Sequence, residues 1–328
     1  MTYSHEIGDC FPLISTHQSQ NRMNFRFTCP SCKSTLQQQS DAQFVCPEDG
    51  RIYECIDGIW RFLLPERVDY YAQFVQEYET VRRAEGRQSE DAAYYRALPF
   101  QDLSGQMATM WQSRAKTFNL LCEQIIQPMQ AKRKRPLTIL DLGAGNGWLS
   151  YQLSKRGHQL AAIDLTVNSF DGLGAFRHYD AEFLPVQAEF THLPWAEPIA
   201  DLIICNASFH YAEDYTAVLQ EVWHLTKLDG MVVICDSPFY TDPENGRKMV
   251  QEREQRFQQQ YGFPSNALNS ENFLWEVRLK QLAEGTNTNY KYIWRTSSAK
   301  KLLRKAKVAL RQQREPAQFP LIIYYRKH

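Results

Sequence analysis

The segment ILDLGAGNGWL, residues 139–149, joins an apolar run to an aspartate and then to three glycines at alternate positions. A strand that opens into a glycine-rich turn before a helix is typical of sites that hold nucleotides. The glycines here are Gly143, Gly145 and Gly147, whereas the dinucleotide pattern G-x-G-x-x-G would place its third glycine at Trp148. Because a plain tight turn would also use these glycines, the rest of the chain has to decide what the segment does.

Short apolar runs alternate with helix-like segments after Pro136. The runs of strand length are residues 137–142, 159–165, 184–190, 200–208 and 230–237, and two later ones, 287–294 and 319–328, flank a basic helix expected over 298–312. Near-continuous apolar strands separated by helices indicate a parallel sheet that is covered on both faces. The sequence therefore predicts a doubly wound, Rossmann-like α/β domain with a mostly parallel sheet.

Polar residues at the ends of two strands indicate a cationic ligand. Asp141 lies two positions before the first glycine, where a carboxylate would repel a pyrophosphate. S-adenosylmethionine suits such a site, because it carries an ammonium and a sulfonium and no phosphate. Asn206 follows the fourth strand, at the carboxyl edge where open α/β sheets bind ligands.

Two further acids are placed to bind the adenosine part of that cofactor. Asp164 ends the second strand, where its carboxylate can accept hydrogen bonds from both ribose hydroxyls. Glu189 follows the third strand and is expected to accept from the adenine amino group, with Leu165 and Phe190 as apolar faces for the ring. Helix N-caps are the alternative reading for Asp141 and Asp164.

Five motifs occur in this order along the chain: LDLGAGNGWLS, AIDLT, QAEF followed by LPW, ADLIICNASFHY and VLQEVWHLTKLDG. Together they resemble the motifs of the class I S-adenosylmethionine-dependent methyltransferases. The resemblance is to the group often labelled type 11, and it covers roughly residues 138–240. It implies a methyltransferase whose cofactor site is made by Asp141, Gly143 and Gly145 at the methionine end, Asp164 at the ribose, and Glu189 with Phe190 at the adenine. The family usually has Asp at the Glu189 position.

Four of the eight cysteines are crowded between residues 29 and 55. The stretch FTCPSCKSTLQQQSDAQFVCPEDGRIYECIDGIWRFL resembles zinc-ribbon modules that precede or partner some methyltransferases, including bacterial 23S ribosomal RNA guanine methyltransferases. The resemblance implies metal ligation by Cys29, Cys32 and Cys46, with Asp49 at the fourth position or Cys55 after a local shift. Structural zinc is almost always held by Cys and His, so a metal-free ribbon with an apolar core is the alternative.

The composition of the chain and the order of its segments limit the classes of protein to which it can belong. A hydrophobic fraction of 43% and a charged fraction of 23% over 328 residues are those of a soluble globular chain. The sparse cysteines and the absence of a signal-peptide pattern predict a cytoplasmic protein with no membrane partner. The expected regions are a polar arm (1–24), a zinc-ribbon-like module (25–64), a helical lid or linker (65–136) and the S-adenosylmethionine-binding methyltransferase domain (137–328).

Basic residues in two parts of the chain suggest two further hypotheses. The chain has no net charge, but residues 291–328 hold eleven Lys or Arg and one acidic residue, which indicates either an RNA contact or a solvated face. Arg114 lies in a largely apolar helical stretch and is expected to bind the methionine carboxylate of the cofactor, with a surface arginine as the alternative. His210 is as compatible with a structural role as with a catalytic one, so no catalytic residue is predicted.

We therefore expect an enzyme that transfers a methyl group from S-adenosylmethionine to a small-molecule acceptor, with zinc as a further structural ligand. One alternative is an RNA base methyltransferase. The other is a binding protein with a methyltransferase fold that has lost catalysis. The sequence does not identify the acceptor, because substrate choice in such folds depends on variable helices and inserts.

Overall fold

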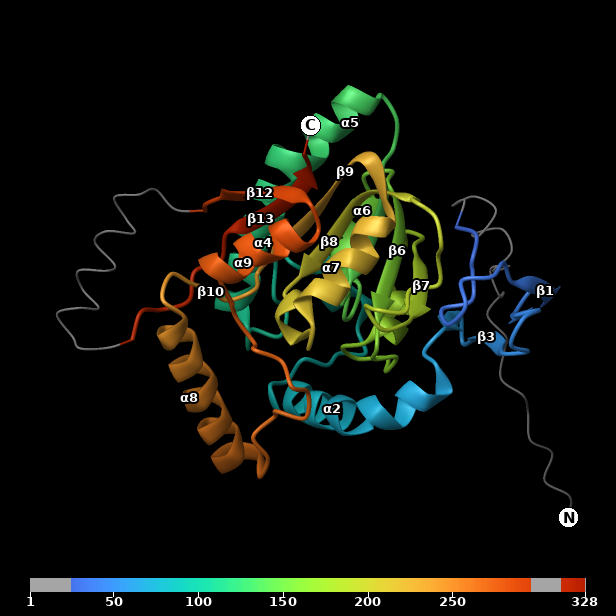
Figure 1. Cartoon of the computed structure of the whole chain (residues 1–328). Helices are drawn as coiled ribbons and strands as arrows, with labels where there is room; N and C mark the ends of the chain where they lie inside the picture. Colours follow the sequence, from blue (N-terminus) through green and yellow to red (C-terminus); the bar gives the residue numbers. More distant parts are fainter. Residues whose placement is uncertain (1–24, 296–313, 328) are drawn as a thin grey trace, which may run out of the picture.

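The computed structural model describes residues 25–295 and 314–327, and one twisted sheet runs through them (Figure 1). Its strands follow the order β1-β2-β3-β4-β7-β6-β5-β8-β9-β13-β12. Their bounds are β1 Gln37–Ser40, β2 Gln43–Val45, β3 Ile52–Ile56, β4 Ile59–Arg61, β5 Thr138–Leu142, β6 Gln159–Asp164, β7 Leu184–Gln187, β8 Ala200–Asn206, β9 Thr226–Cys235, β12 Thr288–Ile293 and β13 Leu321–Arg326. A separate parallel pair joins β10 (Phe239–Tyr240) to β11 (Leu274–Trp275).

The centre of the sheet is parallel and doubly wound, as the apolar runs predict. β7, β6, β5, β8 and β9 run in the same direction, and the order along the chain reverses between β5 and β8. β13 is antiparallel to both β9 and β12. Ligands of open α/β sheets bind at the carboxyl ends of the strands where the order reverses. The predicted fold class is confirmed, and it places the glycine turn after β5 at that point.

Helices cover both faces of the sheet. Their bounds are α2 Pro65–Ala84, α3 Ala92–Ala97, α4 Ala108–Leu121, α5 Gln127–Arg133, α6 Trp148–Ser154, α7 Tyr215–His224, α8 Pro243–Tyr261 and α9 Glu276–Gly285, with a π-helical turn at Cys122–Ile126. One apolar cluster contains residues of α3, α4 and α6, and the other contains residues of α7 and α9. Neighbouring residues of β5 alternate between them, since Ile139 packs with the first cluster and Leu140 with the second.

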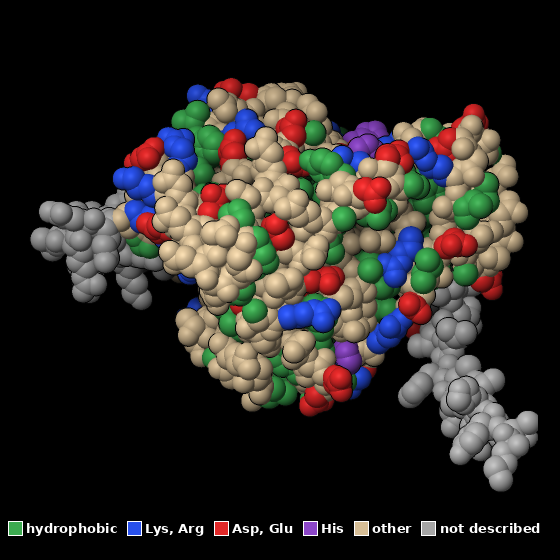
Figure 2. Space-filling model, turned by 90° about the horizontal axis from the view of Figure 1, so that it is seen from below, with side chains coloured by type: hydrophobic (Ala, Val, Ile, Leu, Met, Phe, Trp, Pro, Cys, Tyr) green, Lys and Arg blue, Asp and Glu red, His purple; other side chains and the backbone are tan. Residues whose placement is uncertain are grey.

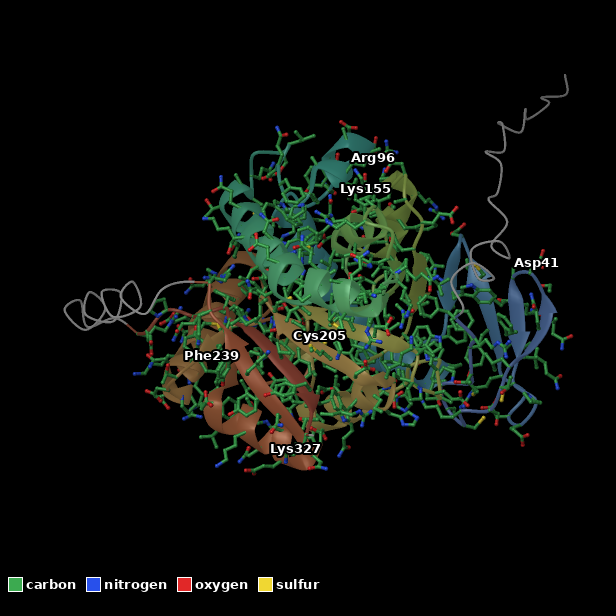
Figure 3. All side chains as sticks on the ribbon, turned by 90° about the horizontal axis from the view of Figure 1, so that it is seen from above. Asp41, Arg96, Lys155, Cys205, Phe239 and Lys327 are labelled. Carbon is green, nitrogen blue, oxygen red and sulfur yellow. The ribbon has the colours of Figure 1, made fainter. Side chains whose placement is uncertain are left out.

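The region of residues 25–64, here called the ribbon-like region, continues the same sheet. β4 pairs in parallel with β7, with Trp60 opposite Val186. The amide of Phe62 donates to the carbonyl of Gln187 at 2.8 Å. Its aromatic residues belong to the apolar cluster that also holds α7 and α9. Figure 3 shows Asp41 at the outer end of this region and Cys205 of β8 near the middle of the sheet.

Two expected features lie outside the described residues: the polar arm (1–24) and the basic helix (298–312). The expected helical segment between the ribbon-like region and the glycine turn is present as α2 to α5. The four region boundaries stay a prediction. In the described part of the chain, no helix combines the length and apolar character that crossing a membrane requires.

Candidate cofactor site

The glycine turn brings the ends of β5 and β6 together. Gly143 has a φ of +72°, and a Cβ there would lie 2.2 Å from the Cβ of Ser208. This position therefore excludes a side chain. The amide of Gly145 donates to Oδ2 of Asp164 at 2.8 Å, which fixes the turn to the end of β6.

A cavity of about 240 Å³, here called the larger cavity, lies beside this turn. Five of the predicted site residues line it: Gly143, Asp164, Leu165, Glu189 and Phe190. Its other wall is formed by residues of α2, which lies across the carboxyl ends of the strands (Figure 1). Figure 2 views the molecule from the side of α2, where acidic and basic side chains are interspersed.

A second space of about 30 Å³, the smaller cavity, adjoins the first. Gly143 lines both, and the predicted residues Gly145, Asn206 and Arg114 line the smaller one. Three further charged residues complete its wall: Arg82, Arg87 and Asp171. The site thus has a larger end with four acidic residues, Asp164 and Glu189 among them, and a smaller end with three arginines.

Asp141 lines neither cavity. Its side chain is buried behind the turn, where Oδ2 accepts a hydrogen bond from Ser150 Oγ at 2.9 Å. Oδ1 is buried and has no partner among the described residues. Burial raises the pKa of this carboxyl group to about 7. The contact that Asp141 makes among the described residues is therefore with Ser150 of α6, behind the turn.

Glu189 is held by protein donors from α2. Arg67 donates from Nε and Nη2 to the carboxylate at 2.9–3.0 Å, and the Tyr71 hydroxyl donates at 2.8 Å. His192 Nδ1 lies 3.0 Å from Oε1. A carboxylate accepts about four hydrogen bonds. The protein donors around Glu189 therefore use most of the acceptor positions that were expected to serve the adenine amino group.

Arg114 reaches the smaller cavity from α4. Its guanidinium lies 5.0 Å from the centre of the Trp111 ring, and it has no hydrogen bond or ion pair to a described residue. Burial lowers the pKa of Arg114. The other two arginines are paired, since Arg82 lies 3.3 Å from Asp171 and Arg87 lies 2.7 Å from Glu85. A partly buried guanidinium without a carboxylate partner among the described residues is the feature of this cavity that best fits an anionic group.

His210 and Tyr211, the two neighbouring residues after β8, lie in different surroundings. His210 is buried, hydrogen-bonded to Ser237 Oγ at 3.1 Å, and lines neither cavity. Burial lowers its pKa to about 3. Tyr211, the next residue, lines the larger cavity. Of the two, the tyrosine is placed to meet a ligand.

The contribution of α2 to the two cavities was not predicted from the sequence. The residues that it supplies to the two cavities are Arg67, Tyr71, Phe74, Tyr78 and Arg82. They are spaced at steps of three and four residues, and such steps place side chains on one face of a helix. This stripe of arginine and aromatic residues was a detectable signal. It could not be assigned to the cofactor site from the sequence, because the glycine turn lies about sixty residues further along the chain.

The predicted metal ligands lie together in the ribbon-like region. Cys29, Cys32, Cys46 and Asp49 each offer one ligand atom, and these atoms lie within 4.8 Å of one another. The sulfur atoms of Cys32 and Cys46 are 3.4 Å apart, and Cys29 Sγ is 3.3 Å from Asp49 Oδ2. Cys55 is not part of this cluster, which favours Asp49 as the fourth member.

Comparisons with known proteins agree with this geometry. Residues 140–234 match the family described as Methyltransferase domain. The malonyl-[acyl-carrier protein] O-methyltransferase of Buchnera aphidicola subsp. Baizongia pistaciae is 31% identical over 97 residues, covering 30% of this chain and 38% of that protein. The demethylmenaquinone methyltransferase of Mycobacterium marinum is 29% identical over 98 residues, covering 30% and 40%.

A third relative is the tRNA 5-carboxymethoxyuridine methyltransferase of Escherichia coli K12, which is 28% identical over 103 residues, covering 29% of this chain and 38% of that protein. The match thus spans about two fifths of the length of these relatives. The family match over residues 140–234 contains the glycine turn, Asp164, Glu189 and Asn206. The chain carries a class I S-adenosylmethionine-dependent methyltransferase domain.

Proposed function

We propose that this protein is an enzyme that transfers a methyl group from S-adenosylmethionine to a small-molecule acceptor. The observation that carries the proposal is the pair of adjoining cavities where the strand order reverses. They share Gly143, and the polar groups at their two ends match the two halves of this cofactor.

The larger cavity suits the adenosine half. Asp164 accepts from the Gly145 amide and from the amide and hydroxyl of Thr166, all at 2.8 Å. One lone-pair position of this carboxylate remains for a ribose hydroxyl. Leu165 and Phe190 offer apolar surface to the adenine ring. Glu189 borders the adenine end, with Arg67 and Tyr71 holding its carboxylate in place.

The smaller cavity suits the methionine half, which carries a carboxylate and an ammonium. Arg114 is the unpaired cation for the carboxylate, and Asn206 and Asp171 offer oxygen atoms for the ammonium. Arginines would also attract a pyrophosphate. However, Trp148 packs against Trp111, with ring centres 6.0 Å apart, at the helix terminus where a dinucleotide needs glycine.

When bound, S-adenosylmethionine would supply a methyl group activated by its sulfonium. An acceptor nucleophile would bond to the methyl carbon in line as the carbon–sulfur bond breaks, and the neutral thioether S-adenosylhomocysteine would be the leaving group. A nucleophile that carries a proton at neutral pH must lose it to a base or to water. Because the methyl group is already activated, positioning of the two reactants can supply much of the rate. The chain's contribution is then to orient the cofactor between α2 and the ends of the strands.

RNA is the second candidate acceptor. It is favoured by the tRNA-modifying relative and by the basic composition of residues 291–328. The larger cavity is covered by α2, which suits a small acceptor better than a nucleotide within a folded RNA. A binding protein without catalysis is the third hypothesis, and the cofactor-binding groups described above argue against it.

Calorimetry with S-adenosylmethionine, S-adenosylhomocysteine and NAD tests the proposal. We expect binding of the first two ligands and no measurable affinity for NAD. Micromolar binding of NAD would overturn the cofactor assignment. Methyl transfer from labelled cofactor to a small-molecule extract, compared with bulk tRNA and ribosomal RNA, then separates the first two candidates. Binding without transfer to any fraction would support the non-catalytic alternative.

We further propose that Cys29, Cys32, Cys46 and Asp49 hold a structural zinc ion. Zn–S bonds of about 2.3 Å in a tetrahedron place ligand atoms about 3.8 Å apart, close to the separations in this cluster. The described cysteines are all free thiols, which fits the predicted cytoplasmic location. A site with one carboxylate should hold zinc less tightly than one with four thiolates.

A further inference from the structure

Three aromatic rings gather on one side of the larger cavity. Phe74 and Tyr78 come from α2, and Tyr211 comes from the turn after β8. The distances between their ring centres are 5.8–6.2 Å, so the three rings form one contiguous cluster. Rings of this kind present electron-rich faces and exclude water from the space between them.

Tyr78 has a position that the other two rings lack, because it lines both cavities. Gly143 and Ala207 are the other residues common to both linings. Both belong to the turns that follow β5 and β8, whereas Tyr78 belongs to α2. The junction of the two cavities is therefore bounded by the sheet edge on one side and by the Tyr78 ring on the other.

On the proposed function, the junction has a definite occupant. The sulfur atom of S-adenosylmethionine is the atom that connects the adenosine half to the methionine half. With adenosine in the larger cavity and methionine in the smaller, the sulfonium has to lie beside Tyr78. Neither Gly143 nor Ala207 brings a charged side chain to the junction.

The neighbours of Tyr78 fix its ring. Arg82 Nη2 donates to the Tyr78 hydroxyl at 2.6 Å, and the guanidinium carbon of Arg82 is 4.3 Å from the ring centre. The charge of Arg82 is itself balanced, since its nitrogen atoms lie 3.3 Å from Asp171 and 3.4 Å from Glu85. On the proposed function, Asp164 binds the ribose and Asp171 the ammonium, so the face of the Tyr78 ring that Arg82 does not cover is the electron-rich surface that remains for the sulfonium.

We propose that the ring of Tyr78 contacts the sulfonium and makes the site prefer the charged cofactor over its neutral product. The preference has a use in turnover, because a product that has lost the positive charge loses this contact and leaves more easily. Tyr78 is then a specificity-determining residue for the cofactor, and the ring, not the hydroxyl, is the group responsible.

The test compares three ligands on the full chain by calorimetry: S-adenosylmethionine, S-adenosylhomocysteine and sinefungin, which carries an ammonium in place of the sulfonium. In Tyr78→Leu, we expect the preference for the two charged ligands over S-adenosylhomocysteine to fall about three- to tenfold, as for loss of a partly desolvated cation–π contact. Tyr78→Phe keeps the ring and should keep the preference. Phe74→Leu is the matched control: it should weaken all three ligands alike.

The outcomes separate this inference from the function on which it rests. A wild-type chain that binds none of the three ligands would overturn the proposed function. Binding with an unchanged preference in Tyr78→Leu would overturn the role of Tyr78 and leave the function intact. If Tyr78→Leu does not fold, p-cyanophenylalanine at position 78 replaces it, because it keeps the ring shape and withdraws its electrons. An unchanged preference there would overturn the inference equally.

Discussion

The cysteine–aspartate cluster of the ribbon-like region and the pair of cavities beside the glycine turn are two polar sites among the described residues, and they are built in opposite ways. The cluster takes its four ligand residues from 21 consecutive positions of the ribbon-like region, Cys29 to Asp49. The cavities take theirs from several helices, from the turns after β5, β6, β7 and β8 and from the segment after α8, so the contributing residues range from Arg67 to Leu268. A local motif can specify the first site, whereas only the complete fold assembles the second.

This difference also determines which interactions are strong. In the cluster, the ligand atoms of Cys32 and Asp49 belong to exposed residues. At the cofactor site, Glu189 of the larger cavity is 2% exposed, and Asp141 behind the glycine turn is 1% exposed. Charged groups removed from water interact more strongly and cost more when their partners are lost. Substitutions at the cavities should therefore have large effects, and substitutions near the cluster should have smaller ones.

The largest effect is expected from the buried acid behind the glycine turn. The pKa of Asp141 is about 7 in the folded chain and 3.8 as an ordinary aspartate. Between these two values the folded state keeps a proton that the unfolded state loses. The contribution of Asp141 to the free energy of unfolding is therefore complete below about pH 4 and is lost as the pH rises to 7. Relative to the wild type, Asp141→Asn should gain stability between pH 4 and pH 8, by at most about 4 kcal/mol.

Urea unfolding of the wild type and of Asp141→Asn at several pH values measures this difference. Asp69→Asn, which replaces an exposed aspartate, is the control and should show a flat difference across the range. A difference for Asp141→Asn that stays constant with pH would contradict the buried, protonated state.

The second effect concerns the ribose contact. Asp164→Ala removes the carboxylate that we propose accepts from the ribose hydroxyl, and it also removes the bond to the Gly145 amide. We expect S-adenosylhomocysteine binding to weaken by about 1.5–3 kcal/mol, the range for hydrogen bonds to a charged group. Calorimetry measures it, with Asp57→Ala as a variant of an exposed aspartate in the ribbon-like region. An Asp164→Ala protein that binds the product normally would show that the larger cavity does not hold the ribose.

The sequence predicted much of the fold because its signals were local. The apolar runs are the strands β5 to β9, β12 and β13, and the glycine spacing predicted the turn after β5, where Gly143 has a positive φ. The resemblance to zinc-ribbon modules also implied the cluster, with Asp49 or Cys55 as its fourth member, and Asp49 is the residue found there. Side-chain pairing between distant elements was not. Arg67 satisfies Glu189 across 122 residues, and no local pattern indicated that α2 would supply this partner.

The third effect concerns Arg114 and the carboxylate of the cofactor. Arg114→Met removes the unpaired guanidinium from the smaller cavity while keeping an unbranched side chain against Trp111. We expect S-adenosylhomocysteine affinity to fall about tenfold, close to the net value of a charged hydrogen bond. Decarboxylated S-adenosylmethionine, which lacks the carboxylate, should bind the wild type and the variant equally. A product-bound structure with Arg114 turned to bulk solvent would refute the contact.

The fourth prediction concerns the cluster alone. Purified protein should contain one zinc ion by elemental analysis, and Asp49→Cys should slow its removal by a chelator, because a fourth thiolate replaces a harder ligand. Cys55→Ser is the matched control and should leave zinc content unchanged, since Cys55 is outside the cluster. Protein without stoichiometric zinc in either form would support the metal-free ribbon.

The smallest effect tests how independent the two sites are. Arg51 joins them, since it lies 3.2 Å from Asp49 and 2.9 Å from Glu66, the residue before Arg67. All three side chains of this connection are partly exposed, and exposed ion pairs contribute about 0–1 kcal/mol. We therefore expect Arg51→Ala, or removal of zinc, to change S-adenosylhomocysteine affinity by less than about threefold.

This expectation would be wrong if the ribbon-like region affected cofactor binding through the backbone. β4 is paired with β7, and Phe62 is bonded to Gln187 two residues before Glu189, so a disturbance of the ribbon-like region has a second route to the adenine end through the backbone. If chelation weakens S-adenosylhomocysteine binding tenfold while Arg51→Ala does not, coupling runs through the strand pair and not through the ion pairs. The ribbon-like region would then be a structural wall of the cofactor site, and its metal would be a requirement for cofactor binding.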